Sequence, residues 1–316
     1  MPLSSSSPTG PAAYSATPPS AADIAPAATV LLLRESSAGA LEVLMTKRAA
    51  GLSFMGGLWV FPGGRMEAAD SAPGVSSRAA LAAVESARHR MLDTGGAPVS
   101  AETALGLHVA ACRETFEESG VLLARRRSSP SPFDTVELAR IAAFRETGGT
   151  ADAFVNLLQD EDLLLEVERL VYWSHWITPS VERRRFDTRF FAVRVPEGQE
   201  ASVDRSESTH HAWLGEHDVR TNLRSGEMKM APPTIATLED LWVSHGRHGG
   251  LDGMLEAERT RAVPPILPKI VRGRGDVEVV LPWDPAYPAI PGEACVVWES
   301  YPPYLAALPS RRALAL

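Results

Sequence analysis

Three carboxylates lie within five residues of one another in the stretch Arg113–Gly120, which reads RETFEESG. On an α-helix, Glu114, Glu117 and Glu118 occupy positions i, i+3 and i+4 and therefore share one face. Like charges at this spacing destabilise an isolated helix, and the negative end of the helix dipole adds to their repulsion. A bound divalent cation would relieve that repulsion. A solvated acidic helix face is the alternative that this cluster alone leaves open.

A helix over residues 101–119 would position these glutamates. At about 100° per residue, its apolar positions fall within roughly 100° of one another, and the three glutamates centre close to the opposite side. Those apolar positions are Leu105, His108, Val109, Cys112 and Phe116. Gly120 follows the last predicted helical residue, as a glycine that ends a helix in the left-handed conformation should. The pattern predicts a helix with a packed face and an acidic face.

A second part of the pattern lies upstream, in the stretch FPGGRMEAAD from Phe61 to Asp70. Its two consecutive glycines, Gly63 and Gly64, follow a short apolar run that is typical of a strand. Without Cβ atoms, such residues let the backbone turn tightly and approach a ligand closely, although a plain turn is the alternative. The glycines and the acidic helix together form a much rarer combination than either part alone.

These two parts resemble the signature of the Nudix hydrolase family, G-x5-E-x7-R-E-U-x-E-E-x-G-U, in which U is aliphatic. The second half is similar to Arg113 through Val121, where Thr115 departs at one U position. The first half is similar to Gly64 through Asp70, where the aspartate stands in place of the usual glutamate. Residues 71–112, 42 in number, separate the halves where the motif has 7, an insertion of 35.

An insertion of this kind resembles one branch of the family, the peroxisomal-type coenzyme A diphosphatases and their bacterial relatives. The resemblance covers about residues 28–280 and rests on the stretches VFPGGRMEAADS, AACRETFEESGVLLA and WITPSVERRRFDTRFFAV. A related branch of coenzyme A hydrolases has an arginine four residues before a glycine, ahead of FPGG. Here Gly57 keeps the glycine, but Ser53 replaces the arginine. Coenzyme A is therefore implied by similarity to the branch and not by a matched motif.

The resemblance implies cleavage of a pyrophosphate that joins a nucleoside to another group, with Mg²⁺ or Mn²⁺ as the cofactor. The implied metal ligands are Glu114, Glu117, Glu118 and the carbonyl of Gly64. Arg113 and Asp70 are expected to pair and to brace the glycine loop against the helix. For the general base two alternatives stay open: Glu114 could orient the attacking water, or Glu207 could deprotonate it.

The basic run Arg183, Arg184 and Arg185 could bind the 3′-phosphate of coenzyme A, because guanidinium groups match phosphate oxygens. A solvated strand end is the alternative for this run. The implied reaction converts coenzyme A or an acyl-CoA to 3′,5′-ADP and a phosphopantetheine. Two alternatives remain. One is a hydrolase of ADP-ribose or NADH, and the other is a Nudix sensor that binds a nucleotide without cutting it. Such sensors tend to lose acids of the box, whereas all three are present here.

The order of the elements around the box predicts an α+β protein with a mixed sheet. The resemblance implies the Nudix fold, a mixed β-sheet sandwiched between helices. We expect strands at 28–35, 41–48, 58–61, 170–179, 186–195 and 210–215, and further helices at 76–92 and 233–246. Residues 1–27, rich in Pro, Ser and Ala, are expected to be disordered. The predicted organisation is a Nudix domain at 28–225 with an insertion at 71–106, then a helical and Pro-rich C-terminal extension at 226–316.

Composition limits the choice of partners and compartment. A net charge of −8 argues against nucleic acid, because no basic stripe is present to neutralise phosphates. No apolar run is long enough to cross a bilayer, and two distant cysteines suit a reducing compartment. We therefore expect a cytoplasmic enzyme whose partner is a small nucleotide, with no membrane association. The long C-terminal extension suggests a lid or the contact of a homodimer.

Overall fold

The computed structural model describes residues 24–52, 55–129, 131–147, 150–202, 208–272, 277–294, 301–306 and 309–314. Eight strands form one mixed sheet: β1 (Ile24–Glu35), β2 (Leu41–Arg48), β3 (Trp59–Val60), β4 (Gly63–Arg65), β7 (Val171–Ile177), β8 (Arg185–Arg194), β9 (Ser208–Gly215) and β10 (Pro265–Ile266). Their order is β10-β7-β8-β1-β2-β3, with β4 paired to β1 and β9 paired to β2. The expected mixed sheet is confirmed.

The long strand β1 brings separate parts of the sequence together. It pairs in parallel with β8. Near its start Ala28 lies opposite Gly64 of β4, and near its end Leu33 lies opposite Val43 of β2. The strand begins at Ile24, so the last four residues of the stretch expected to be disordered belong to the sheet; residues 1–23 lie outside the described part of the chain.

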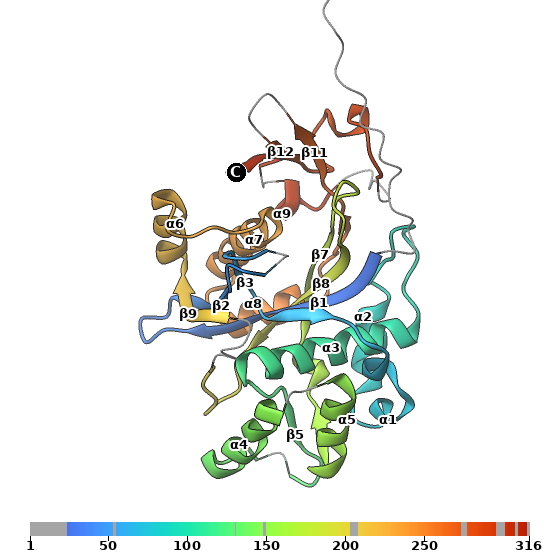
Figure 1. Cartoon of the computed structure of the whole chain (residues 1–316), viewed down its shortest axis with the longest axis vertical. Coiled ribbons are helices and arrows are strands. Elements are labelled where there is room, and N and C mark those ends of the chain that lie inside the picture. The colour runs from blue at the N-terminus through green and yellow to red at the C-terminus, as the bar shows by residue number, and fades with distance from the viewer. Residues whose placement is uncertain are drawn as a thin grey trace, which may run out of the picture.

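Helices cover both faces of this sheet (Figure 1). Alternate residues of β1 point to opposite faces, as the two-residue period of a strand requires. Val30 and Leu32 pack with α3 (Ala101–Ser119) in one buried cluster. Leu31 and Leu33 pack in the second cluster with α7 (Pro232–His248) and α8 (Leu251–Glu258). The arrangement confirms the α+β fold class, a sheet between helices.

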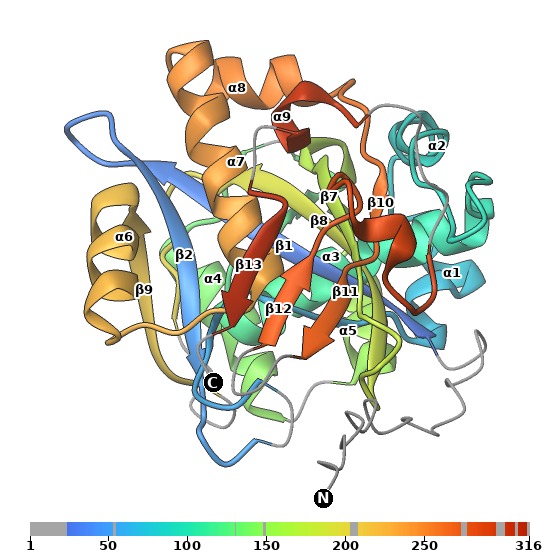
Figure 2. The same cartoon turned by 90° about the horizontal axis from the view of Figure 1, so that it is seen from above.

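The last part of the C-terminal extension, after β10, forms a small sheet of its own, with strands β11 (Lys269–Arg272), β12 (Val277–Val280) and β13 (Arg311–Leu314) in that order. It lies on the same side of the main sheet as α7, and Figures 1 and 2 show it next to that helix. Val279, Leu281 and Leu305 bury themselves in the α7-side cluster. Two further helices are α6 (Glu216–Ser225), which follows β9, and α9 (Pro303–Ala306), which belongs to the C-terminal extension.

Residues 71–106 contain α1 (Pro73–Ser76), α2 (Leu81–Arg88) and the first turns of α3, and they contribute no strand to the main sheet. The helix expected at roughly 76–92 is present but shorter, as α2, because the chain leaves the helical path between α1 and α2. There the carbonyl of Arg78 accepts a hydrogen bond from the Leu165 backbone N–H at 2.7 Å, and Ala79 bridges to the same residue. This pairing with a later segment cannot be read from local periodicity.

The segment after the acidic helix contains elements that the sequence patterns did not predict. They are β5 (Ala124–Arg126), α4 (Thr135–Ala142), α5 (Ala151–Asp160) and β6 (Leu163–Leu165).

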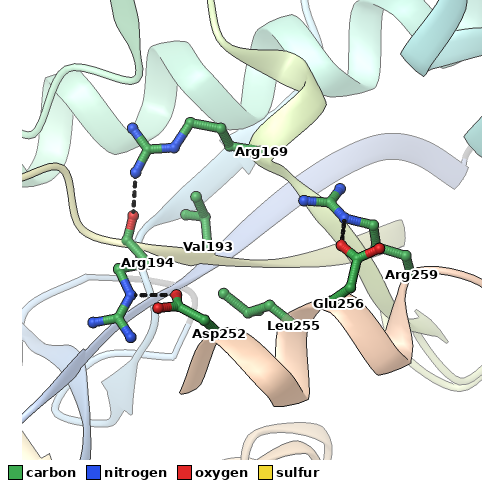
Figure 3. Close-up of a pocket in the computed structure, with 7 residues that line it drawn as sticks. All are labelled: Arg169, Val193, Arg194, Asp252, Leu255, Glu256 and Arg259. Atoms are coloured by element: carbon green, nitrogen blue, oxygen red, sulfur yellow. Dashed lines mark hydrogen bonds and ion pairs between the residues drawn. The ribbon is translucent and has the colours of Figure 1, made fainter. Parts of the chain in front are cut away.

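Within the described part of the chain, no helix is long and apolar enough to span a membrane. A cavity of about 330 Å³ opens where α8 crosses the end of β8 (Figure 3).

Candidate active site

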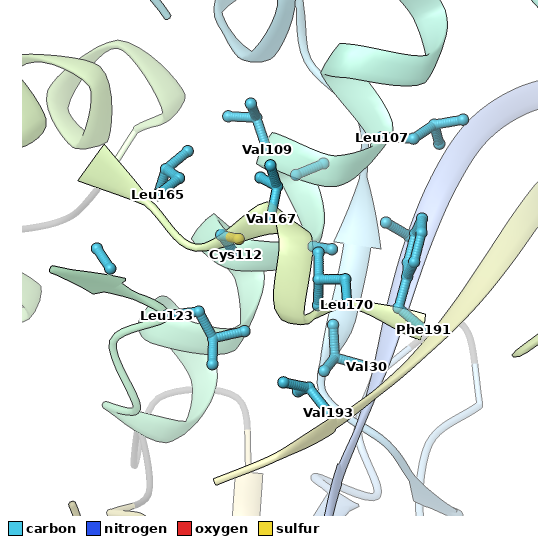
Figure 4. Packing of buried hydrophobic residues seen from close by; sticks show 14 of the residues in the cluster. Val30, Leu107, Val109, Cys112, Leu123, Leu165, Val167, Leu170, Phe191 and Val193 are labelled. Carbon is cyan, nitrogen blue, oxygen red and sulfur yellow. The ribbon is translucent and has the colours of Figure 1, made fainter. Parts of the chain in front are cut away.

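Helix α3 presents the glutamates because both of its ends and its apolar face are held. Ser100 Oγ accepts a hydrogen bond from the Thr103 backbone N–H at 3.0 Å, which caps the start of the helix. Gly120 adopts φ +73° and ends it, as expected. The predicted apolar face is buried, and Figure 4 shows Val109 and Cys112 within the cluster that includes Val30 of the sheet.

The two halves of the split motif meet at Gly63 and Gly64. The backbone N–H of Gly63 donates a hydrogen bond of 2.9 Å to Glu118 Oε2, across the entire insertion. A Cβ atom on Gly64 would lie 2.3 Å from Glu114 Oε1, closer than non-bonded atoms approach. Gly63 has φ +155°, and a Cβ there would lie 2.5 Å from the carbonyl oxygen of Ala28. Gly63 is therefore required for close pairing with β1, and a side chain at Gly64 would displace the Glu114 carboxylate on the acidic face of α3.

Arg113 is buried and connects both halves. Its guanidinium has five N–H donors, and all five are used: two bind Asp70, one binds the carbonyl of Arg65, one binds Glu114 and one binds Glu117. The bonds to Asp70 measure 2.8 and 2.9 Å, and Asp70 is also completely buried. The expected pairing of these two residues is present, and it fixes the carboxylates as well as the loop.

The site carries more negative charge than its single arginine compensates. Burial raises the pKa of Glu114 to about 7; Arg113 opposes this rise, and the Glu117 carboxylate adds to it. Burial likewise raises the pKa of Glu117, against the opposing effect of Arg113. Both shifts mean that the charged forms are poorly solvated. A cation near these oxygens would therefore stabilise the ionised forms.

The donor chemistry of the site fits a divalent cation, although the ligands are not assembled. Within the described residues, no three His, Cys, Asp or Glu side chains converge as a ready-made metal site. However, the buried Oε1 atom of Glu117 has no hydrogen-bond partner, and buried carboxylate oxygens rarely lack one. Carboxylate and carbonyl oxygens are the ligands that Mg²⁺ prefers. Glu114, Glu117 and Glu118 thus have the donor chemistry that a divalent cation requires.

The other residues predicted for the site differ in where the structure places them. Glu207 and Ser53 lie outside the described residues. Arg183 and Arg184 are exposed in the turn between β7 and β8. Arg185 departs from the expectation of a solvent-facing cluster: it is 2% exposed, and its Nη2 atom binds Glu293 Oε2 at 2.7 Å. A run of three arginines in sequence is divided here because the last one begins β8 and turns inward.

Arg145 is a residue of the site that sequence analysis missed. Its Nε atom donates to the carbonyl of Glu117 at 3.0 Å, and its Nη1 atom donates to Ser202 Oγ at 2.8 Å. The Ser202 backbone N–H also donates to the Ser119 carbonyl at 2.7 Å. These bonds attach Ser202 to the end of α3. No local pattern could have identified a contact between residues this far apart.

A buried polar group beside the site was also missed. One row across the sheet connects this group to the glycine loop. Ala28 of β1 lies between Gly64 of β4 and Arg189 of β8, and Arg189 lies opposite His175 of β7. Asp187 contacts both the His175 imidazole and the Arg189 guanidinium. Arg189 Nη2 donates to the Leu92 carbonyl of the insertion at 2.7 Å. The alternation of charged residues along β8 was the available signal, since alternate residues share one face.

Comparisons with known proteins agree with this geometry. Residues 18–241 match the family model described as the NUDT19 Nudix domain. Acyl-coenzyme A diphosphatase NUDT19 of Homo sapiens is 28% identical over 229 residues, which cover 63% of this chain and 60% of that protein. The protein of the same name from Gallus gallus is 29% identical over 231 residues, covering 62% and 60%. The chain thus spans less than two thirds of the length of these curated relatives.

A solved structure gives the same picture. The crystal structure of a Nudix hydrolase from Alicyclobacillus acidocaldarius is 29% identical to this chain and superposes with a TM-score of 0.55. The match covers 70% of this chain and 92% of that one. The similarity therefore extends over nearly the whole of the solved chain.

Proposed function

The chain belongs to the NUDT19 Nudix domain family, and we propose that it is a metal-dependent pyrophosphohydrolase. The substrate we propose is coenzyme A or an acyl-CoA, cut to 3′,5′-ADP and a phosphopantetheine. The observation that carries this proposal is the closure of the split box, in which Gly63 binds Glu118 and Gly64 lies against Glu114. That closure supports one reaction centre built from residues on both sides of the insertion.

Each residue of the box has a distinct role in this proposal. Glu114, Glu117 and Glu118, with the Gly64 carbonyl, would hold Mg²⁺ or Mn²⁺. When bound, such an ion neutralises charge on the phosphoanhydride and lowers the pKa of its water. Arg113 restrains two of the carboxylates, and Asp70 holds Arg113 in place. Fixing charged groups before the reaction lowers the cost of reorganisation in the transition state.

For the general base we retain the two alternatives, Glu114 and Glu207. Glu114 is positioned by Arg113 Nη1 at 2.8 Å and by the backbone of Gly64. Arg145 binds both Ser202 and the end of α3, and Ser202 comes five residues before Glu207 in the sequence. A rate measurement on Glu207→Gln separates these alternatives: a Glu207 base requires a large fall in kcat, whereas a Glu114 base leaves kcat close to that of the wild type.

Two observations favour coenzyme A as the substrate. The curated relatives from Homo sapiens and Gallus gallus are named acyl-coenzyme A diphosphatases. In addition, Arg183 and Arg184 are exposed together in the turn before β8, where they could bind a 3′-phosphate with charge-assisted hydrogen bonds. Because Arg185 is buried against Glu293, we assign this role to the other two arginines only.

The experiment that tests the substrate is a comparison of kcat/KM on one preparation with Mg²⁺ or Mn²⁺. The substrates are coenzyme A, dephospho-CoA, ADP-ribose and NADH. We expect coenzyme A to be cut best, and Arg184→Ala to narrow its advantage over dephospho-CoA. A clear preference for ADP-ribose or NADH would remove the coenzyme A assignment and leave the pyrophosphatase assignment intact. Nucleotide binding without cleavage of any substrate would favour a sensor.

A further inference from the structure

A second candidate binding site lies at the opposite end of the sheet from the glutamates. The cavity of about 330 Å³ is bounded by the end of β8, by α8 and by the 3₁₀ turn Val167–Arg169 (Figure 3). Arg194 of β8 lies opposite Leu33 on β1, whereas Gly64 lies opposite Ala28. At about 3.3 Å per residue, these positions are roughly 17 Å apart along β1. The cavity is therefore separate from the candidate active site.

Three guanidinium groups surround an apolar floor in this cavity. Arg169, Arg194 and Arg259 line it, and Val193 and Leu255 form the floor (Figure 3). Each guanidinium has five N–H donors. Arg169 uses two of them, on Glu166 and on the carbonyl of Arg194.

The other two arginines also keep free donors. Arg194 uses two N–H groups, on Asp252 and Glu35. Arg259 likewise uses two, on Glu256 and on the carbonyl of Glu168. In each of the three arginines, three of the five donors have no hydrogen-bond partner among the residues that the structure describes.

The two acids that line the cavity are held much less firmly than the arginines. The side chains of Asp252 and Glu256 are both 80% exposed, whereas those of Arg169, Arg194 and Arg259 are 30%, 33% and 40% exposed. Exposed ion pairs contribute little to stability, so these carboxylates can turn outward at low cost. A ligand oxyanion could then occupy their place beside the guanidinium groups.

From this geometry we propose that the cavity binds a small oxyanion with a short apolar arm, of the phosphate monoester class. Guanidinium groups bind phosphate oxygens through paired N–H donors, which accounts for the three arginines. The buried floor of Val193 and Leu255 accounts for the apolar arm. The volume lies at the lower end of the range for small-molecule sites, which restricts the arm to a few carbons. The proposal does not depend on the reaction assigned to the glutamates.

The test uses the full chain freed of divalent metal with EDTA, so that the glutamate site has no cation to attract an anion. Calorimetric titration compares n-butyl phosphate, inorganic phosphate and n-butanol. We expect saturable binding of n-butyl phosphate, weaker binding of inorganic phosphate and none of n-butanol. Equal affinity for the two phosphates would overturn the assignment of an apolar arm, and no saturable binding of n-butyl phosphate would overturn the site.

Two substitutions of opposite charge locate the binding. Arg259→Gln removes a cation and should weaken n-butyl phosphate binding by about tenfold, as expected for losing a charged hydrogen bond. Glu256→Gln removes the competing carboxylate and should tighten binding by severalfold, while Arg247→Gln, an exposed change on α7, should leave the affinity as in the wild type. If Glu256→Gln fails to tighten binding, the cavity is only an ion-pair network that docks α8, and the proposal is wrong.

Discussion

Arg113 and Asp70 form a buried ion pair with bonds of 2.8 and 2.9 Å, although the entire 71–112 segment separates them in the sequence. The pair joins the glycine loop to the acidic helix, and the same guanidinium restrains Glu114 and Glu117. Stability and the geometry of the acidic face therefore depend on one contact. This relationship explains how a motif interrupted by an insertion still forms one site.

Removing the acid of this pair should destabilise the protein strongly. Asp70→Ala leaves the buried Arg113 without its main partner, and we expect the free energy of unfolding to fall by about 3–5 kcal/mol. Urea denaturation followed by circular dichroism measures the change. Glu85→Gln, which breaks the exposed pair with Arg88, is the control and should have little effect. Equal stability of Asp70→Ala and the wild type would contradict the role of the pair.

Adding a single methyl group at Gly64 should damage activity more than stability. The new Cβ would lie 2.3 Å from Glu114 Oε1, so this carboxylate must move away from the loop. A displacement of about 1 Å in a catalytic group can cost roughly 100-fold, and we expect a fall of this order in kcat/KM for Gly64→Ala. Gly246→Ala is the matched control, because a Cβ there has no neighbour within 4 Å. A fully active Gly64→Ala enzyme would exclude the close approach.

The Asp187 carboxyl group makes the free energy of unfolding depend on pH in the acid range. Burial alone would raise the pKa of this carboxyl, but contacts with His175 and Arg189 outweigh burial and lower it to about 2. The pKa in the unfolded chain is about 3.9. A folded pKa below the unfolded value stabilises the native state above pH 4, and this contribution is lost as the pH falls from about 4 to 2.

The pH dependence can be measured as a difference between two proteins. Between pH 5 and pH 2, the stability advantage of the wild type over Asp187→Asn should shrink by on the order of 2 kcal/mol. Urea denaturation at a series of pH values gives this difference, and titrating groups that do not interact with Asp187 cancel from it. An advantage that stays constant over the interval would show that the carboxyl has an ordinary pKa in the folded protein.

Sequence patterns predicted those parts of the fold that local chemistry determines. Helix α3 has the expected bounds, since its apolar period, Ser100 and Gly120 all act within a few residues of the helix. The break between α1 and α2 was missed because it depends on Leu165, which is distant in the sequence. The inward turn of Arg185 has the same origin, since its partner Glu293 belongs to the C-terminal extension.

The candidate site divides in the same way. The glutamates and glycines were predictable because they match the order of residues in a family signature. Arg145 and His175 belong to no such signature. Only folding brings Arg145 to the C-terminal end of α3 and His175 to the row of the sheet that contains Gly64. Contacts of this kind depend on tertiary packing, which short-range spacing does not encode.

The most direct test of the account is the initial rate of 3′,5′-ADP release from coenzyme A by the wild type and by Glu118→Gln. With saturating Mg²⁺ we expect release by the wild type, arrest by EDTA, and a loss of about 100- to 1,000-fold in Glu118→Gln, since removing one group that stabilises the transition state electrostatically typically costs about this much. Glu102→Gln, in the first turn of the same helix, should retain the wild-type rate. Glu118→Gln turning over coenzyme A as fast as the wild type, or a metal-bound wild type releasing no 3′,5′-ADP, would contradict the account.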